Sequence, residues 1–549
     1  MTIDARSYDS GIDGGTRSSS SLAFDGDRIL DVETLSIPSS SERNSAIWAE
    51  KSTDAALTDK RTNWTPLWIA NFVSFLLALQ YSAFVMSIWP YLQQISNQTV
   101  TQNFYGLSVA LYALFQGSSA PLYGRWNTRT RQVRPPVITA CCITIVGSLV
   151  YCSAEQIGTV WVRQWVVLGA RILLGIGIAC IPVIRAYVAT GCRPEDKHRA
   201  LNANFATDQA GMALGPALQI LFSRLDYPGY NVFGILRINM YTAPALASVL
   251  GTIVVILVMA CAFRERYSGV VPTEIKRTKY FVLPNFDVAA VVTCMALWCC
   301  LAFVQTNTAT ILPHYTMILY DWDDQTALKY TGYLTMVCRS ITSLGYALIA
   351  IFNPPEIDNR KSLLIGFALF LSYHLITFPW PFYTGTIDYQ ITALIASANS
   401  STLAPTTTMS NTTLMLGCSP SYSWCAWTPK VPMLLLFIAF DVFIPLGWLS
   451  TLSPLNVLLS RILGARMQGT MQGLFSLTGS LARTVAPLLM SWLFSSFGPQ
   501  YAWGLEIVLL SSCVIAISVL YKRLVPCKTV DNLAYGHHVT YKRGVLYKL

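Results

Sequence analysis

The sequence predicts an all-α polytopic membrane protein in which twelve transmembrane helices form two groups of six. Of its 549 residues, 53% are hydrophobic and only 12% are charged, whereas a soluble domain carries about 25% charged residues. Apolar stretches such as ITACCITIVGSLVYCSA and ALASVLGTIVVILVMACAF approach the ~20 residues that span a bilayer core. A net charge of +10 on such a chain is expected to reflect membrane topology, and nucleic-acid binding is not expected.

The predicted spans follow one another between polar loops. They lie at residues 64–92, 104–124, 135–154, 160–189, 200–224, 236–263, 286–320, 327–352, 361–380, 431–456, 466–495 and 501–522. The first six make an N-terminal bundle (64–263) and the last six a C-terminal bundle (286–522), joined by a loop at 264–285. The Ser-rich segment 1–63 has no signal-peptide h-region, so span 1 is expected to direct insertion. That segment is expected to be a disordered tail, and residues 523–549 form a second tail.

Basic residues orient the chain in the membrane. The loops after spans 2, 4, 6, 8 and 10 all carry Lys or Arg, as in RWNTRTRQVR and GCRPEDKHR. Loops after odd-numbered spans are nearly free of them, and ISNQTVTQ and YDWDDQT contain none. The positive-inside rule therefore predicts that both tails and the 264–285 loop are cytosolic.

Candidate modification sites fall on the opposite, luminal side. Asn97, Asn399 and Asn411 each begin an N-x-[ST] sequon, which marks a candidate glycosylation site. The last two lie in a long luminal loop at 381–430. Cys418 and Cys425 lie in the same loop, where an oxidising compartment permits a disulfide between them.

The end of span 2, GSSAPLYGRW, precedes the first basic loop. It resembles the major facilitator hairpin motif G-x-x-x-D-R-x-G-R-R at Gly117, Gly124 and Arg125. Pro121 and Leu122 stand where that motif has its acid and first arginine. The acid-centred cytosolic latch is therefore expected to be absent, and a closed gate would depend on Arg125, on packing, or on residues 358–361 of the second half.

Spans 4 and 5 carry further motif residues. Arg171 lies near the middle of span 4, where a charge costs at least ~2.5–3.5 kcal/mol and is expected to face a cavity or a partner. Arg185 follows about four turns later and faces the same side; snorkelling to the cytosolic interface is the alternative. In span 5, Gly211, Gly215 and Pro216 resemble a G-x-x-x-G-P antiporter element, although small residues at this spacing also simply pack helices.

Other polar residues within the spans complete the predicted solute pathway. We hypothesise that Arg171 and Asp441, at corresponding depths of spans 4 and 10, pair across the cavity; two separately satisfied charges are the alternative. Asp208, His374 and Arg483 are further polar groups in the spans, and His374 is expected to be a satisfied interface residue or a proton sensor. The remaining candidates for solute contact are Gln80, Tyr81, Gln305, Asn307 and Arg339.

The N-terminal tail contains a sorting signal of acidic dileucine type. Asp25, Ile29 and Leu30 occupy its positions in DGDRIL. Clathrin adaptors read such signals and deliver proteins to endosomes and lysosomes. The adaptors, membrane lipid and a small solute are therefore the expected partners.

Taken together, these features resemble a lysosomal branch of the major facilitator superfamily. The resemblance is carried by LQYSAFVMSIWPYL, APLYG, RILLGIGIACIPVIRAY and ALGPALQ, and it covers most of residues 65–522. It implies a multi-pass protein of the lysosomal or late endosomal membrane that carries out solute transport or chloride conductance. Arginines on one helix face suit an anion. The leading interpretation is an alternating-access transporter of a small anion, with coupling to protons left open; an anion channel and a non-transporting scaffold are the alternatives. No Walker A, nucleophile-elbow or zinc motif indicates an enzyme or a cofactor.

Overall fold

The computed structural model describes residues 61–96, 100, 102–222, 224–225, 229–232, 236–270, 286–322, 324–383, 385–387, 418, 422–526, 539–542 and 545–548. The predicted sorting signal at Asp25, Ile29 and Leu30 and the three sequons at Asn97, Asn399 and Asn411 lie outside these residues.

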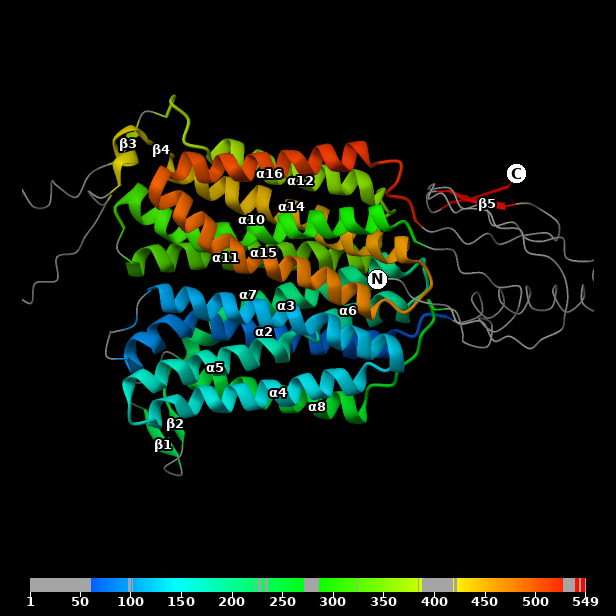
Figure 1. The fold of residues 1–549 in the computed structure, drawn as a ribbon, viewed down its shortest axis with the longest axis horizontal. Coiled ribbons are helices and arrows are strands. Elements are labelled where there is room, and N and C mark those ends of the chain that lie inside the picture. Colours follow the sequence, from blue (N-terminus) through cyan, green and yellow to red (C-terminus); the bar gives the residue numbers. More distant parts are fainter. Residues whose placement is uncertain are drawn as a thin grey trace, which may run out of the picture.

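Two groups of helices lie side by side in Figure 1, the first coloured blue to green and the second green to red. The N-terminal group consists of α2 (Trp64–Ile95), α3 (Gln102–Thr130), α4 (Arg134–Ser153), α5 (Val160–Ile178), α6 (Ile181–Gly191), α7 (Lys197–Phe222) and α8 (Ala243–Cys261). The C-terminal group consists of α10 (Val288–Tyr320), α11 (Asp324–Phe352), α12 (Asn359–Thr377), α14 (Met433–Leu463), α15 (Gly469–Phe497) and α16 (Pro499–Val519). With α5 and α6 counted as one broken span, this is the predicted arrangement of six plus six.

Several predicted spans differ from the observed helices: α3 and α14 run six and seven residues beyond their predicted ends at 124 and 456, and spans 4 and 6 differ for local reasons. Span 4 is interrupted between Ile178 and Ile181, and Pro182 lies in the first turn of α6, where its missing N–H is tolerated. Span 6 begins at Ala243 and not at 236, because Leu236–Ile238 (β2) pairs with Tyr230–Val232 (β1) in an antiparallel hairpin. The Asn239 side chain accepts hydrogen bonds from the next turn, including the Thr242 backbone N–H at 3.0 Å, and so ends the hairpin before the helix begins.

Within the described residues, nine helical segments are long and apolar enough to cross a membrane. The spans α3, α7 and α12 are not among them. The first two of these carry the motif glycines, such as Gly117 and Gly211, and also polar residues such as Gln116 in α3 and Asp208 in α7. Polar residues are tolerated in a membrane helix only where it faces protein or water, so α3 and α7 are expected to lie in the interior of the bundle, where they contact α15 and α11.

The two groups meet along α3 against α15 and α7 against α11. Gly124 of α3 lies directly against the Gly469 backbone of α15, and Gly473 lies against Ala120 and Pro121. Such small residues let helix backbones approach closely in a membrane. The α3–α15 contact is therefore a seam of backbone against backbone.

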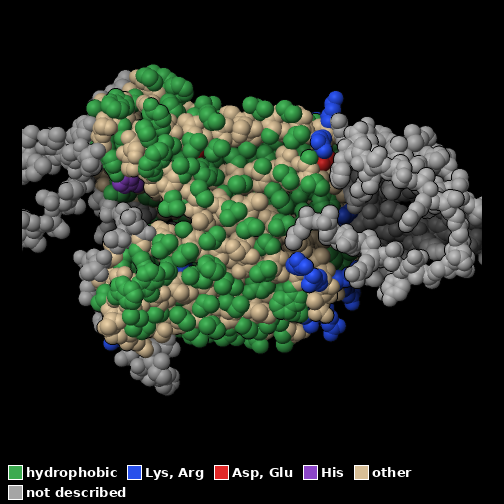
Figure 2. All heavy atoms as spheres, in the orientation of Figure 1, with side chains coloured by type: hydrophobic (Ala, Val, Ile, Leu, Met, Phe, Trp, Pro, Cys, Tyr) green, Lys and Arg blue, Asp and Glu red, His purple; other side chains and the backbone are tan. Residues whose placement is uncertain are grey.

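The two ends of the bundle differ in charge. Lys and Arg side chains gather at the right-hand end in Figure 2, which we call the basic end; it holds the α3–α4 and α6–α7 connections. The opposite end, which carries the β1–β2 pair and the short β3–β4 pair (Gly385–Thr386 with Pro429–Lys430), is called the hairpin end. This asymmetry follows the charge pattern that predicts a cytosolic basic end.

Candidate functional site

Four arginines on four helices are linked by electrostatic interactions, directly or through shared neighbours. They are Arg171 of α5, Arg185 of α6, Arg339 of α11 and Arg483 of α15, which we call the arginine cluster. Electrostatic interactions link its members. The charge of Arg185 is close enough to interact with that of Arg483, and Arg171 and Arg483 both interact with the Tyr112 hydroxyl. Arg185 and Arg339 both act on Asp208. The cluster is thus contributed by both halves of the protein.

Aromatic and amide groups surround two of these arginines. The Arg171 guanidinium lies 4.2 Å from the centroid of the Tyr112 ring, which stacks on Tyr81 at 5.8 Å. A cation over an aromatic face is stabilised without a counter-ion. Arg483 donates to Gln116 Oε1 at 3.4 Å and to Ser480 Oγ at 2.9 Å. Neither contact neutralises the arginine charge.

The other two arginines meet adjacent residues of α7. Arg185 Nη2 lies 3.4 Å from Asp208 Oδ2, with 18% and 9% of the two side chains exposed, and its guanidinium also lies over the Phe205 ring. Arg339 donates to Gln209 Oε1 at 2.7 Å. Asp208 is therefore the acid that compensates the charge of the arginine cluster. Among the described contacts of the cluster, four positive side chains are balanced by this one negative side chain.

The hypothesis that Arg171 pairs with Asp441 is wrong. Arg171 engages the Tyr112 ring, and buried Asp441 Oδ1 has no hydrogen-bond partner among the described residues. The arginine of this broken span that forms an ion pair is Arg185, about four turns further along, with Asp208. Equal distance from the ends of two spans did not predict pairing because depth does not determine which way each helix is rotated.

Two of the remaining candidate residues point away from the cluster. Gln80 accepts from Ser248 and Thr252 of α8, at 3.4 and 3.2 Å, and so joins helices within the N-terminal half. Asn307 lies in a cavity inside the C-terminal half with His374, while Gln305 is half-buried on the same helix α10. Tyr81 remains beside the cluster through its stacking on Tyr112.

The glycines of the antiporter-like element pack α7 against α2. A Cβ on Gly211 would lie 2.5 Å from the Phe75 carbonyl oxygen, and Ser82 Oγ donates to the Met212 carbonyl at 2.8 Å. Gly215 lies against Ser82, and Pro216 follows within the helix. The structure thus favours the packing interpretation of this element.

Contacts across the two halves close the basic end. Lys197 Nζ donates to Ser460 Oγ at 3.1 Å, and Arg199 Nε donates to the Ala350 carbonyl at 2.8 Å. The backbone N–H of Thr470 donates to Thr128 Oγ1 at 3.0 Å. Together with the Gly124–Gly469 contact, these residues form what we call the basic-end gate.

The gate has no acid-centred latch among its described contacts. Arg125 is exposed, and Asp358 pairs with Arg360 of its own half, where it also caps α12. Of the three means of closure that the sequence allowed, packing is the one observed. An acid that the motif search missed does lie nearby: Glu265 Oε1 accepts from the backbone N–H groups of Val133 and Arg134, at 2.7 and 2.9 Å, and so caps α4.

Restoring the acid of the motif with Pro121→Asp is expected to leave the gate closed. Pro121 is half-buried in α3 beside Gly473, and the charged gate residues Lys197 and Arg199 already donate to Ser460 and Ala350. We expect labelling of a Ser460→Cys reporter by a membrane-impermeant maleimide to change by less than about fivefold, since an unpaired charge near the surface contributes at most ~1 kcal/mol. Leu122→Asp, one residue further and 69% exposed, is the control. Strong labelling only in Pro121→Asp would show that the position still houses a latch.

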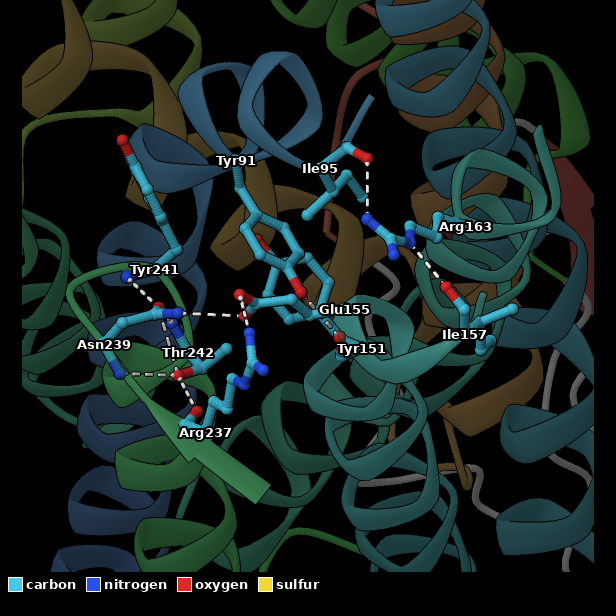
Figure 3. A network of polar contacts seen from close by, with 10 residues as sticks. All are labelled: Tyr91, Ile95, Tyr151, Glu155, Ile157, Arg163, Arg237, Asn239, Tyr241 and Thr242. Atoms are coloured by element: carbon cyan, nitrogen blue, oxygen red, sulfur yellow. Dashed lines mark hydrogen bonds and ion pairs between the residues drawn. The ribbon is translucent and has the colours of Figure 1, made fainter. Parts of the chain in front are cut away.

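A network at the hairpin end pins the N-terminal half (Figure 3). The carboxylate of Glu155, which is 5% exposed, lies 3.4 Å from Arg237 Nη1 and accepts from Asn239 Nδ2 at 3.0 Å. Arg163 donates to the carbonyl oxygens of Ile157 and Ile95, at 2.5 and 3.4 Å. The network joins the β1–β2 pair to the ends of α2, α4 and α5. The sequence did not reveal the role of Glu155 because its partners, Arg237 and Asn239, lie more than 80 residues further along the chain.

A disulfide joins Cys418 and Cys425, whose Cα atoms are 6.5 Å apart. Trp424, next to Cys425, is 1% exposed, and its ring centroid lies 5.2 Å from that of Phe494. Gly498, at φ +91°, lies against the same indole. The bond therefore fastens an aromatic cap over the α15–α16 turn at the hairpin end.

Comparison with known proteins identifies the class. The family model of the Major Facilitator Superfamily matches residues 70–423, well over half of the chain, so the chain belongs to that superfamily of membrane transporters. Among its relatives, it is 27% identical over 497 residues to Major facilitator superfamily domain-containing protein 8 of Xenopus laevis, an alignment that covers 85% of this chain and 93% of that protein.

Solved structures share the fold. The human organic anion transporter MFSD10 matches with a TM-score of 0.53 at 13% identity, over 85% of this chain and 99% of that one. The proton:xylose symporter XylE, bound to 6-bromo-6-deoxy-D-glucose, matches with a TM-score of 0.57 at 13% identity, over 85% and 96% of the two chains. At such identities the likeness extends to the fold alone.

Proposed function

We propose that this transporter moves a small anionic solute across the lysosomal or late endosomal membrane by alternating access. The observation that carries the proposal is the excess of positive charge in the arginine cluster, where Asp208 is the acid that meets Arg185 at 3.4 Å. In a site shielded from water, unit charges about 4 Å apart interact by ~4 kcal/mol at an effective dielectric of 20. An anion would relieve the mutual repulsion of these arginines.

The gate supports the second part of the proposal. The two halves touch at the basic end through Lys197–Ser460 and Arg199–Ala350, and the positive-inside rule assigns that end to the cytosol. This conformation would then receive solute from the lumen. Rocking of one half against the other around the cluster would release it to the cytosol.

The lysosomal location rests on the sequence. The dileucine-type signal at Asp25, Ile29 and Leu30 would bring the chain to clathrin adaptors, and the sequons at Asn97, Asn399 and Asn411 would face the lumen. The relative from Xenopus laevis aligns over most of both chains, which supports a shared cellular role.

Arg483→Gln is expected to lower anion movement by about tenfold or more. Arg483 is half-buried, whereas Arg171 is 3% exposed, so Arg483 is the better placed of the two to contact a solute. Loss of ~1.4 kcal/mol of binding energy corresponds to that tenfold change. Anion current and solute counterflow would be measured in patched, enlarged lysosomes.

The control is Arg224→Gln, which removes an equal charge from an exposed position. Saturable counterflow would identify a carrier. A selective steady current would identify an anion channel, the second candidate, because the same arginines suit a pore. Equal activity of both variants and the wild type would remove the cluster from the pathway and favour a non-transporting scaffold.

A further inference from the structure

A small cavity lies inside the C-terminal half, apart from the arginine cluster. It is lined by residues of α10, α12, α15 and α16, including Asn307, Tyr373, His374 and Glu506. His374 is 1% exposed and Glu506 is 3% exposed. His374 Nε2 and Glu506 Oε2 lie 2.7 Å apart. This pair lies near the hairpin end, because α12 ends at Thr377 and α16 begins at Pro499.

The contacts of His374 determine where its protons lie. Its Nδ1 is 2.7 Å from the Phe370 carbonyl oxygen, and a carbonyl can only accept, so Nδ1 carries a hydrogen. At 2.7 Å from Glu506 Oε2, a bare Nε2 lone pair would face the lone pairs of the carboxylate and be repelled. The contact does not have the angles of a hydrogen bond, since Nε2 has no hydrogen-bond partner among the described residues, but the 2.7 Å separation favours one proton held by the pair.

Several further polar atoms lie among the apolar side chains that line the cavity. Both side-chain atoms of Asn307, together with Glu506 Oε1 and Tyr373 Oη, are buried with no hydrogen-bond partner among the described residues. Buried polar atoms without partners are rare in folded proteins and cost ~1–3 kcal/mol each. Such atoms around a small cavity suit a water molecule that relays a proton.

Other charged groups on the surrounding helices face elsewhere. The His314 ring of α10 lies against Tyr422 and Phe494, and Asp441 of α14 acts on Cys338. Arg483 of α15 contacts Gln116 of α3. Cys300 and Tyr373, which interact with Glu506, are neutral when protonated. Among the described residues, His374 is thus the base that can share a proton with Glu506.

We propose that His374 and Glu506 form a binding site for one proton within the C-terminal half, open to exchange on the luminal side. This inference rests on the proposed function: in such a transporter, the site would hold the coupling proton. Asn307, on α10, connects it to a helix that also packs against α15. Loss of the proton would leave a buried net negative charge, which is costly, so protonation and the packing of α10, α12 and α16 are linked.

The test uses the purified full-length protein and three variants: Glu506→Gln, His374→Gln and the double variant. Melting temperature (Tm) is measured between pH 5 and 8, and each value is compared with the double variant so that other titrating groups cancel. An unfolded histidine loses its proton near pH ~6.5, whereas the proposed site requires the folded protein to hold one proton there. Wild-type stability relative to the double variant should therefore fall as pH rises above that value, because the folded state binds more protons.

Glu506→Gln should reverse the direction in which stability changes with pH. A buried histidine without its carboxylate stays neutral, so the unfolded state binds more protons below pH ~6.5 and stability falls on acidification. His374→Gln should keep the wild-type sign, since a buried lone carboxyl holds a proton that the unfolded chain releases. Differences on the order of 5 °C are expected for a disrupted buried pair.

Parallel profiles for all four proteins would overturn the proposal. A sodium-dependent rise in Tm at pH 8 that Glu506→Gln abolishes would also overturn it, because the site would then hold a metal cation. The melting profiles need no substrate. A wild type that moves no chloride across proteoliposomes would count against the proposed transport, and the reversal of sign would still decide the proton site.

Discussion

Gly124→Ala is expected to open the basic-end gate. A Cβ on this glycine would overlap the carbonyl oxygen of Gly469 in the other half, and a backbone oxygen cannot rotate away as a flexible side chain would. Overpacking of this kind costs about 1–3 kcal/mol. Because the closed state has backbone against backbone here, the strain acts on that state and shifts the population toward the open one by about 5–150-fold.

The same helix supplies a matched control. A Cβ added to Gly106 of α3 would meet no heavy atom within 4 Å, so Gly106→Ala should leave the gate unchanged. The readout is labelling of a Ser460→Cys reporter by a membrane-impermeant maleimide from the basic side, quantified by peptide mass spectrometry. Ser460 is 0% exposed and contacts Lys197. Equal labelling of the two glycine variants would show that the α3–α15 seam does not hold the gate.

Asp208→Asn is expected to destabilise the protein more than other single charge removals. It leaves Arg185, whose side chain is only 18% exposed, beside Arg339 and Arg483 with no acid. Removing one partner of a buried ion pair costs up to about 3–5 kcal/mol, and this corresponds to a fall in Tm on the order of 5–10 °C. The double variant Arg185→Gln with Asp208→Asn should recover much of this loss, because the uncompensated charge goes too.

A pair at the surface provides the comparison. Arg461 and Glu356 lie 2.7 Å apart with 23% and 29% of their side chains exposed, so Glu356→Gln should cost at most ~1 kcal/mol. Thermal unfolding of the purified variants measures the difference. If Asp208→Asn melts no lower than Glu356→Gln, the cluster is solvated well enough to need no acid, and the case for an anion in the cavity weakens with it.

Hydrophobic length and loop charge were enough to predict the spans. The stretch 288–320 reads as one apolar run and forms one helix, α10. The errors fell where local chemistry competes with hydropathy. Pro182 marks the break between α5 and α6, and Asn239 holds residues 236–242 out of helix. Both residues were visible in the sequence, but hydropathy alone does not weigh them.

The site was harder to predict than the fold. Arg171, Arg185 and Arg339 were recognised because charges are rare in apolar spans, and they do belong to one cluster. The partners of the arginines were not recognised, because they are distant in the sequence. Asp208 lies 23 residues from Arg185, and Gln116 lies 367 residues from Arg483. Asn307 looked like a residue of the central pathway and instead lies beside His374. One sequence does not tell how each helix is rotated about its axis.

The sequence by itself determined that this protein is a membrane bundle of six plus six helices, which end is basic, and that the first half has no aspartate latch at Pro121. These properties depend on hydropathy, charge and residue identity, which are local. Only the tertiary structure decided that packing at Gly124 closes the basic end, that Asp208 is the acid of the arginine cluster, and that His374 meets Glu506. Those contacts depend on helix rotation and approach, which packing across distant segments establishes.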